Sequence, residues 1–150
     1  MNTLILITTI ISSLALIAMV IYVAYQKHSM VSEATIRAYE TLQKEVFYDL
    51  KYEPQKLSNE YLETSASREA VKYLDRIEHF CLGVNEGIYS LKLLYKLDGP
   101  YIVEQYSLWV PLIIAKRKRR KKPDMYVEFE KVAKGIQKIR FAKMEGKRGL

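Results

Sequence analysis

Leu4 to Tyr25 has the sequence LILITTIISSLALIAMVIYVAY, 22 residues in which two threonines and two serines are the only polar residues besides the tyrosines. A helix that rises about 1.5 Å per residue would be about 33 Å long here, close to the roughly 30 Å hydrocarbon core of a bilayer. The four hydroxyls do not exclude a membrane helix, because each can donate to a backbone carbonyl one turn earlier. Tyr22 and Tyr25 fall where aromatic rings favour the interface, and Lys27 and His28 follow at once. The stretch predicts a transmembrane helix.

A cleaved signal peptide is the alternative for this stretch. Such a peptide has a basic region before a shorter apolar core and a small-residue cleavage site after it. Here no Lys or Arg precedes the run, the run is too long, and residues 20–25 offer no good site, so we expect an uncleaved anchor. Lys27, Arg37 and Lys44 follow the span, and cationic flanks favour the cytoplasm. We therefore expect a single-pass protein of the inner (plasma) membrane with its N-terminus outside and its C-terminal domain cytoplasmic.

Charge is distributed unevenly along the 150 residues, although 27% charged residues, 49% hydrophobic residues and a net charge of +7 are ordinary totals. Residues 1–26 carry no charged side chain, whereas residues 116–150 carry 14 Lys/Arg and 4 Asp/Glu. This excludes a uniform soluble globule and a disordered chain, and the single cysteine excludes a disulfide scaffold. The expected parts are a transmembrane anchor, a juxtamembrane helix with connector, a helical domain and a disordered basic tail, at 1–26, 27–64, 65–142 and 143–150.

Apolar residues after the span recur with helical periodicity, and no strand-like alternation is present in the sequence. Residues 32–50 should form a helix that continues the span and ends before Pro54. A turn-rich interval at 56–64, with a short helix capped by Ser58, should precede a helix over 67–84. The inward faces of the two long helices should carry Ile36, Tyr39, Gln43, Val46, Phe47 and Leu50, and then Val71, Leu74, Ile77, Cys81 and Val84.

Glycine and proline divide the next stretch into two helices. Ser90 suits the N-cap of a short helix that ends at Leu97, and Gly99 suits its C′ position. Pro100 fits the first turn of a helix over about 101–120, which Pro111 should kink because it removes a backbone hydrogen bond. The inward face should carry Val103, Tyr106, Leu108, Trp109, Leu112 and Ile113.

Asp124 should cap a final helix that frays into disorder at about residue 143. The inward face of this helix should carry Tyr126, Phe129, Val132, Ile136 and Ile139. The expected fold is all-α, with a single N-terminal transmembrane helix followed by a four- or five-helix cytoplasmic bundle.

Four blocks of this region form a recognisable pattern, at residues 73–89 (YLDRIEHFCLGVNEGIY), 94–99, 109–113 and 126–130. The first block contains L-x-x-x-E-x-x-x-x-G-x-x-x-G, and a later aromatic pair follows; the positions are Leu74, Glu78, Gly83, Gly87, Tyr126 and Phe129. Over about 70–137 the chain resembles a domain-of-unknown-function family of short bacterial and phage-associated proteins. The resemblance implies one N-terminal membrane span and a cytoplasmic helical domain, and the family has no assigned chemistry that could be carried over to this chain. The run at 116–122 is more basic than is usual in that family.

Catalytic chemistry is sparse in this sequence. His28 and His79 are far apart, and Cys81, on the apolar face of its helix, fits a buried thiol better than a nucleophile or a zinc ligand. Glu78 and His79 are neighbours that point about 100° apart on a helix, so they do not face each other as an acid–base pair. No phosphate-binding loop, nucleophile elbow or paired-histidine motif is present. We therefore expect no enzyme activity, no catalytic or metal-binding residues and no cofactor.

Seven consecutive cations, KRKRRKK at 116–122, are the most distinctive feature of the sequence. Three interpretations stay open: a solvated helix end, attraction to the anionic inner leaflet at about 1 kcal/mol per cation, and binding of nucleic acid or another polyphosphate. No aromatic residue interleaves the run, as single-strand stacking would require. The last helix adds lysines that lie on nearly one face. The candidate anion-contacting residues are Lys116, Arg117, Lys118, Arg119, Arg120, Lys121, Lys122, Lys131, Lys134 and Lys138.

Tyrosines form a second group, with 12 in the chain. Several lie beside apolar faces, where a ring can be buried while its hydroxyl stays in water; these include Tyr39, Tyr73, Tyr95, Tyr106 and Tyr126. The alternative is an exposed recognition surface, because tyrosine is enriched at binding hot spots. We expect burial for any single ring, and for the group as a whole a contact with a second copy or another protein.

These features predict a non-enzymatic single-pass membrane protein whose cytoplasmic helical domain presents a basic surface. Its expected partners are the lipid bilayer, anionic lipid headgroups, and a protein partner or a second copy of the chain, with nucleic acid less favoured. The alternative is a membrane effector or sensor, phage-encoded or acting in phage defence. Such a protein would bind a nucleotide, polyphosphate or nucleic-acid ligand on the same surface.

Overall fold

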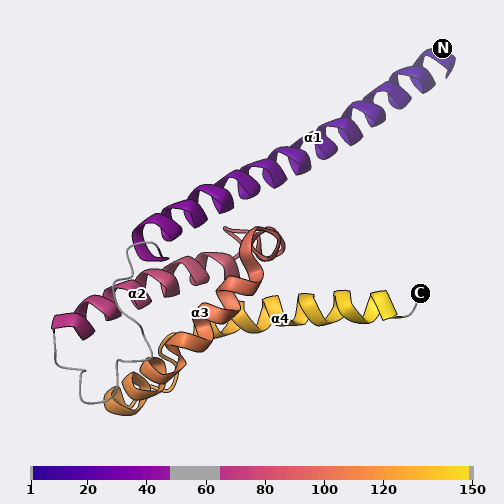
Figure 1. Cartoon of the computed structure of the whole chain (residues 1–150). Helices are drawn as coiled ribbons and strands as arrows, with labels where there is room; N and C mark the ends of the chain where they lie inside the picture. Colours follow the sequence, from indigo (N-terminus) through magenta and orange to yellow (C-terminus); the bar gives the residue numbers. More distant parts are fainter. Residues whose placement is uncertain (1, 48–64, 149–150) are drawn as a thin grey trace.

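Helices alone build the part of the chain that the computed structural model describes, residues 2–47 and 65–148 (Figure 1). In chain order the elements are α1 (Asn2–Leu42), the π-helical turn η1 (Gln43–Phe47), α2 (Ser65–Asn85), α3 (Leu91–Arg120) and α4 (Val127–Arg148). The all-α prediction is confirmed, with one long apolar N-terminal helix followed by a helical bundle. The predicted inward Leu50, the helix end at Pro54 and the interval at 56–64 with its Ser58 cap lie outside the described residues.

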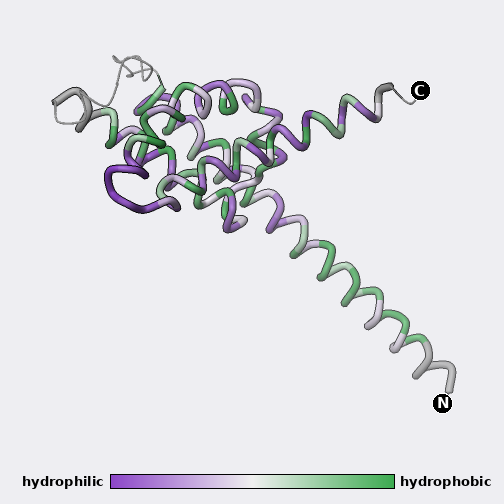
Figure 2. Tube along the Cα trace, turned by 90° about the horizontal axis from the view of Figure 1, so that it is seen from below, coloured by the Kyte–Doolittle hydropathy of each residue, from purple (hydrophilic) through white to green (hydrophobic). Residues whose placement is uncertain are grey.

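α1 continues without a break from the apolar stretch into the bundle. Its N-terminal half projects alone, away from the other helices (Figures 1 and 2), and its apolar side chains are exposed, 54% at Ile7 and 72% at Tyr25. The other end of α1 and η1 pack into the bundle, and the side chains buried there are Thr35, Tyr39, Leu42 and Val46. One helix therefore joins the segment that resembles a membrane span directly to the core.

The predicted inward face of this helix is wrong at Ile36, which is 39% exposed. The buried face is centred on Thr35 and Tyr39 instead. Thr35 is buried because its hydroxyl oxygen accepts the backbone N–H of Ser90 at 2.8 Å and donates to the Val31 carbonyl at 2.6 Å. Apolar periodicity does not predict the burial of a threonine, because a threonine is buried only where its hydroxyl finds hydrogen-bond partners.

α2 buries the face that its apolar periodicity predicts. Leu74, Ile77, Cys81 and Val84 are buried, and Val71 is half-buried. The turn that follows requires two glycines. Gly87 has a φ of 75°, which L side chains rarely adopt, and a Cβ on Gly83 would lie 2.5 Å from the ring of Tyr89. The turn therefore packs closely against the end of α2 and reverses the chain into α3.

α3 consists of two helical segments that meet at Asp98, the one residue inside it with non-helical backbone angles (φ −162°, ψ 41°). Ser90 is the N-cap, as predicted, and its Oγ accepts the backbone N–H of Leu93 at 3.2 Å. The break at Asp98 confirms the predicted division into a short helix that ends at Leu97 and a second helix that begins near Pro100, whereas Pro111, where a kink is predicted, has helical backbone angles. Of the predicted inward residues, Trp109, Leu112 and Ile113 are buried, and Val103, Tyr106 and Leu108 are half-buried.

The predicted left-handed C′ position at Gly99 is also wrong, because Gly99 does not have a positive φ. The lack of a side chain matters there for packing. A Cβ would lie 2.8 Å from the Tyr95 ring and 3.2 Å from Ile136 of α4. Gly99 thus allows the bend of α3 to approach α4 closely.

The start of α4 differs from the prediction, because another helix caps it. Glu78 of α2 accepts the backbone N–H of Glu128 at 3.0 Å and that of Phe129 at 2.8 Å. Tyr126, with a φ of 59°, turns the chain just before the helix. The predicted Asp124 cap is wrong because a carboxylate about 50 residues earlier already pairs with the unsatisfied N–H groups of this helix end.

The end of α4 also differs from the prediction of a disordered tail at 143–150. The helix continues to Arg148. Residues 141–146 are exposed, although Lys143 lies over the Tyr95 ring at 5.8 Å from its centroid. Alanine, lysine, methionine and glutamate in this stretch are strong helix formers, so the helix continues where few packing contacts support it. The predicted inward face is otherwise confirmed, with Tyr126, Phe129, Val132 and Ile136 buried and Ile139 half-buried.

Candidate anion-binding surface

The basic run lies at the far end of the bundle from the free half of α1. Residues 116–120 form the last turns of α3, and residues 121–122 begin the turn into α4. In Figure 1 this end of α3 is at the lower left, whereas the N-terminus of α1 is at the upper right, and the hydrophilic stretch at the left of Figure 2 agrees. Lys121 ends the helix in a left-handed conformation (φ 52°), and its N–H donates to the carbonyls of Arg117 and Lys118. The run is therefore an ordered helix end.

Arg117 belongs to the interior of this end of the bundle. Its Nε donates to the carbonyl of Met125 at 2.8 Å, and its Nη2 donates to Glu130 at 2.9 Å. The two side chains are 23% and 22% exposed. Lys134 also donates to Glu130, at 2.6 Å, and the two cations hold the pKa of the Glu130 carboxyl below its usual value. Arg117 thus fastens the α3–α4 turn and is poorly placed for an external anion.

The lysines of α4 are partly neutralised in the same way. Lys131 donates to Glu128 at 2.7 Å, which lowers the pKa of that carboxyl, and Asn85 of α2 donates to Glu128 as well. Lys138, the third candidate on this face, is exposed. Over the first turns of α4, two lysines of the predicted face are therefore paired with glutamates of the same helix, Lys131 with Glu128 and Lys134 with Glu130.

The exposed cations gather at the end of α3 itself. The side chain of Lys116 is half-buried, and burial together with Arg120 and Arg119 lowers its pKa. The remaining five residues of the run are exposed: Lys118, Arg119, Arg120, Lys121 and Lys122. A shallow hollow of about 530 Å³ lies here, lined by Ile114, Arg117, Lys118, Lys121 and Pro123. Ile114 and Pro123 contribute apolar surface to this hollow, and Lys118 and Lys121 contribute exposed cations.

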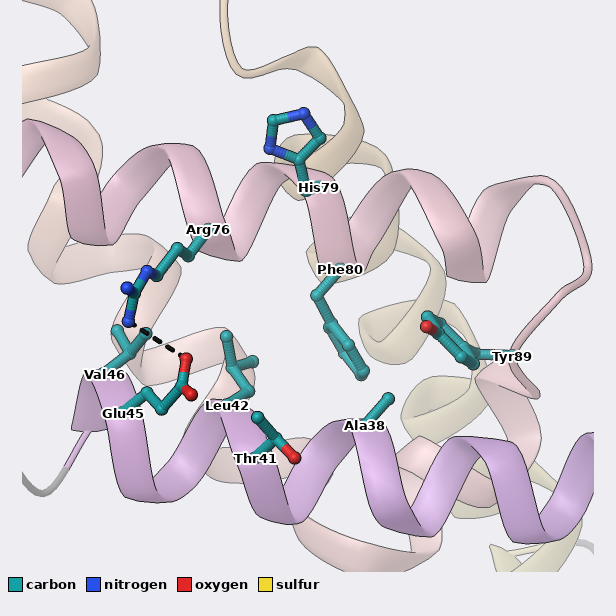
Figure 3. Close-up of a pocket in the computed structure, with 9 residues that line it drawn as sticks. All are labelled: Ala38, Thr41, Leu42, Glu45, Val46, Arg76, His79, Phe80 and Tyr89. Atoms are coloured by element: carbon teal, nitrogen blue, oxygen red, sulfur yellow. Dashed lines mark hydrogen bonds and ion pairs between the residues drawn. The ribbon is translucent and has the colours of Figure 1, made fainter.

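A second hollow, of about 420 Å³, lies between α1 and α2 (Figure 3). Leu42 of α1 and Val46 of η1 line it with apolar surface from one side, and Phe80 of α2 does so from the opposite side. The ion pair of Arg76 with Glu45, at 3.0 Å, crosses one end. His79 points away from α1 in Figure 3 and bonds to the Asp75 carbonyl at 3.0 Å. Glu45, the acid that lines this hollow, is therefore already paired with Arg76.

Burial affects two further groups that could take part in chemistry, Cys81 and Glu78. Burial raises the pKa of the Cys81 thiol well above its usual value, which disfavours the reactive thiolate. Burial also raises the pKa of Glu78, although the backbone N–H groups of Glu128 and Phe129 oppose the shift. Among the described residues no group of three or more His, Cys, Asp or Glu side chains could hold a metal ion.

Two tyrosine hydroxyls form long-range hydrogen bonds that sequence patterns did not reveal. Tyr39 of α1 donates to Asp98 at the bend of α3, at 2.8 Å, and Tyr126 donates to Asp75 of α2, at 3.0 Å. Burial and the neighbouring carboxylates raise the pKa of both phenols. These rings are buried as expected, but their hydroxyls pair with acids instead of water.

One helix of the described chain is long and apolar enough to cross a membrane, and it lies near the N-terminus. Its length and composition meet this requirement, and its apolar side chains are exposed.

Comparison with known proteins gives a family but no activity. Residues 7–136 match the family model described as domain of unknown function (DUF4760). The match begins inside the apolar stretch and so extends well beyond the blocks at 73–130 on which the resemblance rests. No curated protein and no solved structure matches the chain. Since the match covers most of the sequence, the protein belongs to the DUF4760 family, which is defined by a domain of unknown function.

Proposed function

We propose that this protein is a non-enzymatic, single-pass membrane protein that holds a helical domain at the membrane and presents the basic end of α3 to an anionic partner. The observation that carries the proposal is the continuity of α1. The same unbroken helix exposes Ile7 to Tyr25 and buries Thr35, Tyr39 and Leu42 in the core. Exposed apolar residues over this length need a lipid or protein cover.

The orientation follows from the flanking charges. Lys27, Arg37 and Lys44 come after the apolar stretch, and the domain beyond it is strongly basic, which favours a cytoplasmic domain and an outer N-terminus in the inner (plasma) membrane. A cytoplasm-specific reporter fused after Leu150 should be active, and the chain should stay with membranes in alkaline carbonate. Release into the soluble fraction would refute the anchor, and activity of a reporter that works only outside the cytoplasm would refute the orientation.

The position of the basic surface favours a partner other than the anchoring bilayer. The surface lies at the opposite end of the bundle from the apolar half of α1 (Figures 1 and 2). Attraction to an anionic surface decays within about 8–10 Å at physiological salt, so cations must lie close to lipid headgroups to bind them. An anionic protein segment or a polyphosphate in solution is therefore favoured over inner-leaflet lipid at this surface.

The test uses the full chain in nanodiscs of zwitterionic phosphatidylcholine, so that no anionic lipid competes. Inorganic polyphosphate is the anionic probe, and the variant Lys118→Gln/Lys121→Gln removes two cations at the hollow. Lys44→Gln/Lys72→Gln is the charge-matched control, because both lysines are exposed on other elements. The first variant should reduce the slope of log affinity against log salt by about two, and the control should retain the wild-type slope. Equal slopes for both double variants would contradict a localised surface.

A second candidate function is a membrane sensor whose ligand changes the association of the spans. The supporting observation is that α3 reaches from the α1 contact at Ser90 and Thr35 to the hollow at Lys118 and Lys121. Cysteine crosslinking between copies through a Leu14→Cys variant should then change when polyphosphate is added. An unchanged crosslinking yield at saturating polyphosphate would exclude this function for that ligand.

A further inference from the structure

We propose that the headgroup phosphate of an anionic phospholipid binds in a small pocket between α1 and the start of α3, at the level where α1 leaves the bilayer. This inference rests on the membrane span of the proposed function. It is independent of the basic end of α3, which lies at the other end of the bundle.

The pocket has the chemistry of an anion site. It has a volume of about 160 Å³ and is lined by His28 and Ser32 of α1 and by Ser90, Lys92, Leu93 and Lys96 at the start of α3. The lining residues thus carry two ammonium groups, two hydroxyls and an imidazole, and none of the described residues that line the pocket is acidic. In proteins, ammonium groups and hydroxyls donate hydrogen bonds to phosphate oxygens.

The positive charge here is not balanced by nearby acids. Lys92 and Lys96 are exposed, and neither forms an ion pair with a carboxylate within the described ranges. The closest acids in the sequence have other partners, since Glu33 pairs with Arg37 along α1 and Asp98 accepts from Tyr39. This contrasts with the paired cations of α4. The pocket thus has a surplus of positive charge that an external anion can complement.

The depth of the pocket matches the headgroup layer. Tyr25 ends the apolar stretch, so His28, three residues on, lies about 4.5 Å further along the helix, and Ser32 lies about 10 Å further. The headgroup layer of each leaflet is roughly 5–8 Å thick. His28 would therefore lie among the headgroups and Ser32 a few Å beyond them. The Ser90 N–H donates to Thr35 at 2.8 Å, and Thr35 lies about 15 Å beyond Tyr25, so this contact places the start of α3 on the domain side of the headgroup layer.

The experiment uses native mass spectrometry of the full chain released from nanodiscs that contain equal phosphatidylglycerol and phosphatidylcholine. The variant Lys92→Gln/Lys96→Gln removes both ammonium groups, and Ser32→Phe fills the pocket without a change of charge. Lys44→Gln/Lys72→Gln is the charge-matched control, because Lys44 lies about 28 Å beyond Tyr25 along the helix. Circular dichroism of each variant checks that the helical content is retained.

The wild-type chain and the control should retain one phosphatidylglycerol each. The double variant should lose this lipid about thirty-fold more readily, since each cation near a bilayer surface contributes about 1 kcal/mol. Ser32→Phe should lose it as well. Equal retention by the control and both pocket variants would overturn the proposal. Displacement of the lipid by 10 mM inorganic phosphate would overturn the assignment to a lipid and indicate a free-anion site. Loss of the chain from nanodiscs altogether would instead refute the membrane span.

Discussion

The carboxylate of Glu78, on α2, caps the first turn of α4 by accepting the backbone N–H of Phe129 at 2.8 Å, while its other oxygen accepts that of Glu128 at 3.0 Å. A negative charge at this place also complements the positive end of the α4 dipole. The contact fixes where α4 begins and how it meets α2. It also positions Glu128 and Glu130, which in turn hold the lysines of α4.

Removal of this cap should destabilise the bundle. Glu78→Ala should lower the free energy of unfolding of the full chain in detergent by about 1–2 kcal/mol, the usual contribution of a helix cap. Chemical denaturation followed by circular dichroism measures the change. Glu86→Ala, an exposed glutamate near the end of the same helix, is the control and should change stability little. Equal losses in the two variants would show that the cap contributes nothing specific.

The buried hydroxyl of Thr35, which joins α1 to α3, should also contribute to the free energy of unfolding. Thr35→Val keeps the shape of the side chain but leaves the Ser90 N–H without its acceptor, which should cost about 1–3 kcal/mol of unfolding free energy. Thr41→Val is a matched control, because its exposed hydroxyl donates only to the Arg37 carbonyl of its own helix. The prediction fails where thermal unfolding in detergent shows the same midpoint for both variants.

Within the basic run, Arg117 should contribute to the stability of the fold, whereas Lys118 and Lys121 should not. Arg117→Gln breaks the contacts with Met125 and Glu130 and should cost about 2 kcal/mol of stability. Lys118→Gln/Lys121→Gln should leave the unfolding free energy within about 0.5 kcal/mol of wild type, because both lysines are exposed. A double variant less stable than Arg117→Gln would contradict this division.

Acid should weaken the α3–α4 turn through Glu130. Hydrogen bonds from Lys134 and Arg117 lower the pKa of Glu130 below its usual 4.5 in the folded chain, so the folded state favours the ionised form. Its contribution is complete above about pH 4.5 and is lost as the pH falls through the lowered folded-state pKa. The free energy of unfolding should therefore fall between pH 5 and 3, and less steeply in Glu130→Gln than in wild type. Glu104→Gln, an exposed glutamate of α3, should retain the wild-type pH dependence; a Glu130→Gln profile as steep as that of Glu104→Gln would contradict the assignment.

Local patterns in the sequence were sufficient for the helices and for much of the core. The unbroken apolar stretch at 4–25 predicted the long N-terminal helix, and the periodicity of Leu74, Ile77, Cys81 and Val84 predicted the buried face of α2. The N-cap at Ser90 was equally visible, because a cap depends on residues three positions apart. These features need only neighbours along one helix.

The tertiary structure alone decided which polar groups meet across the bundle. Glu78 replaced Asp124 as the cap of α4, Thr35 took the buried position predicted for Ile36, and Arg117 became an internal contact within a run of seven cations. Each depends on a partner from another part of the fold, at a separation from 13 residues to more than 50, so no local pattern encodes it. The same is true of His28 and Lys92, which line one pocket only because the turn at Gly87 and the Ser90–Thr35 hydrogen bond bring α3 back to α1. Short-range periodicity determines a helix, whereas the place of a charge in space depends on how the helices pack.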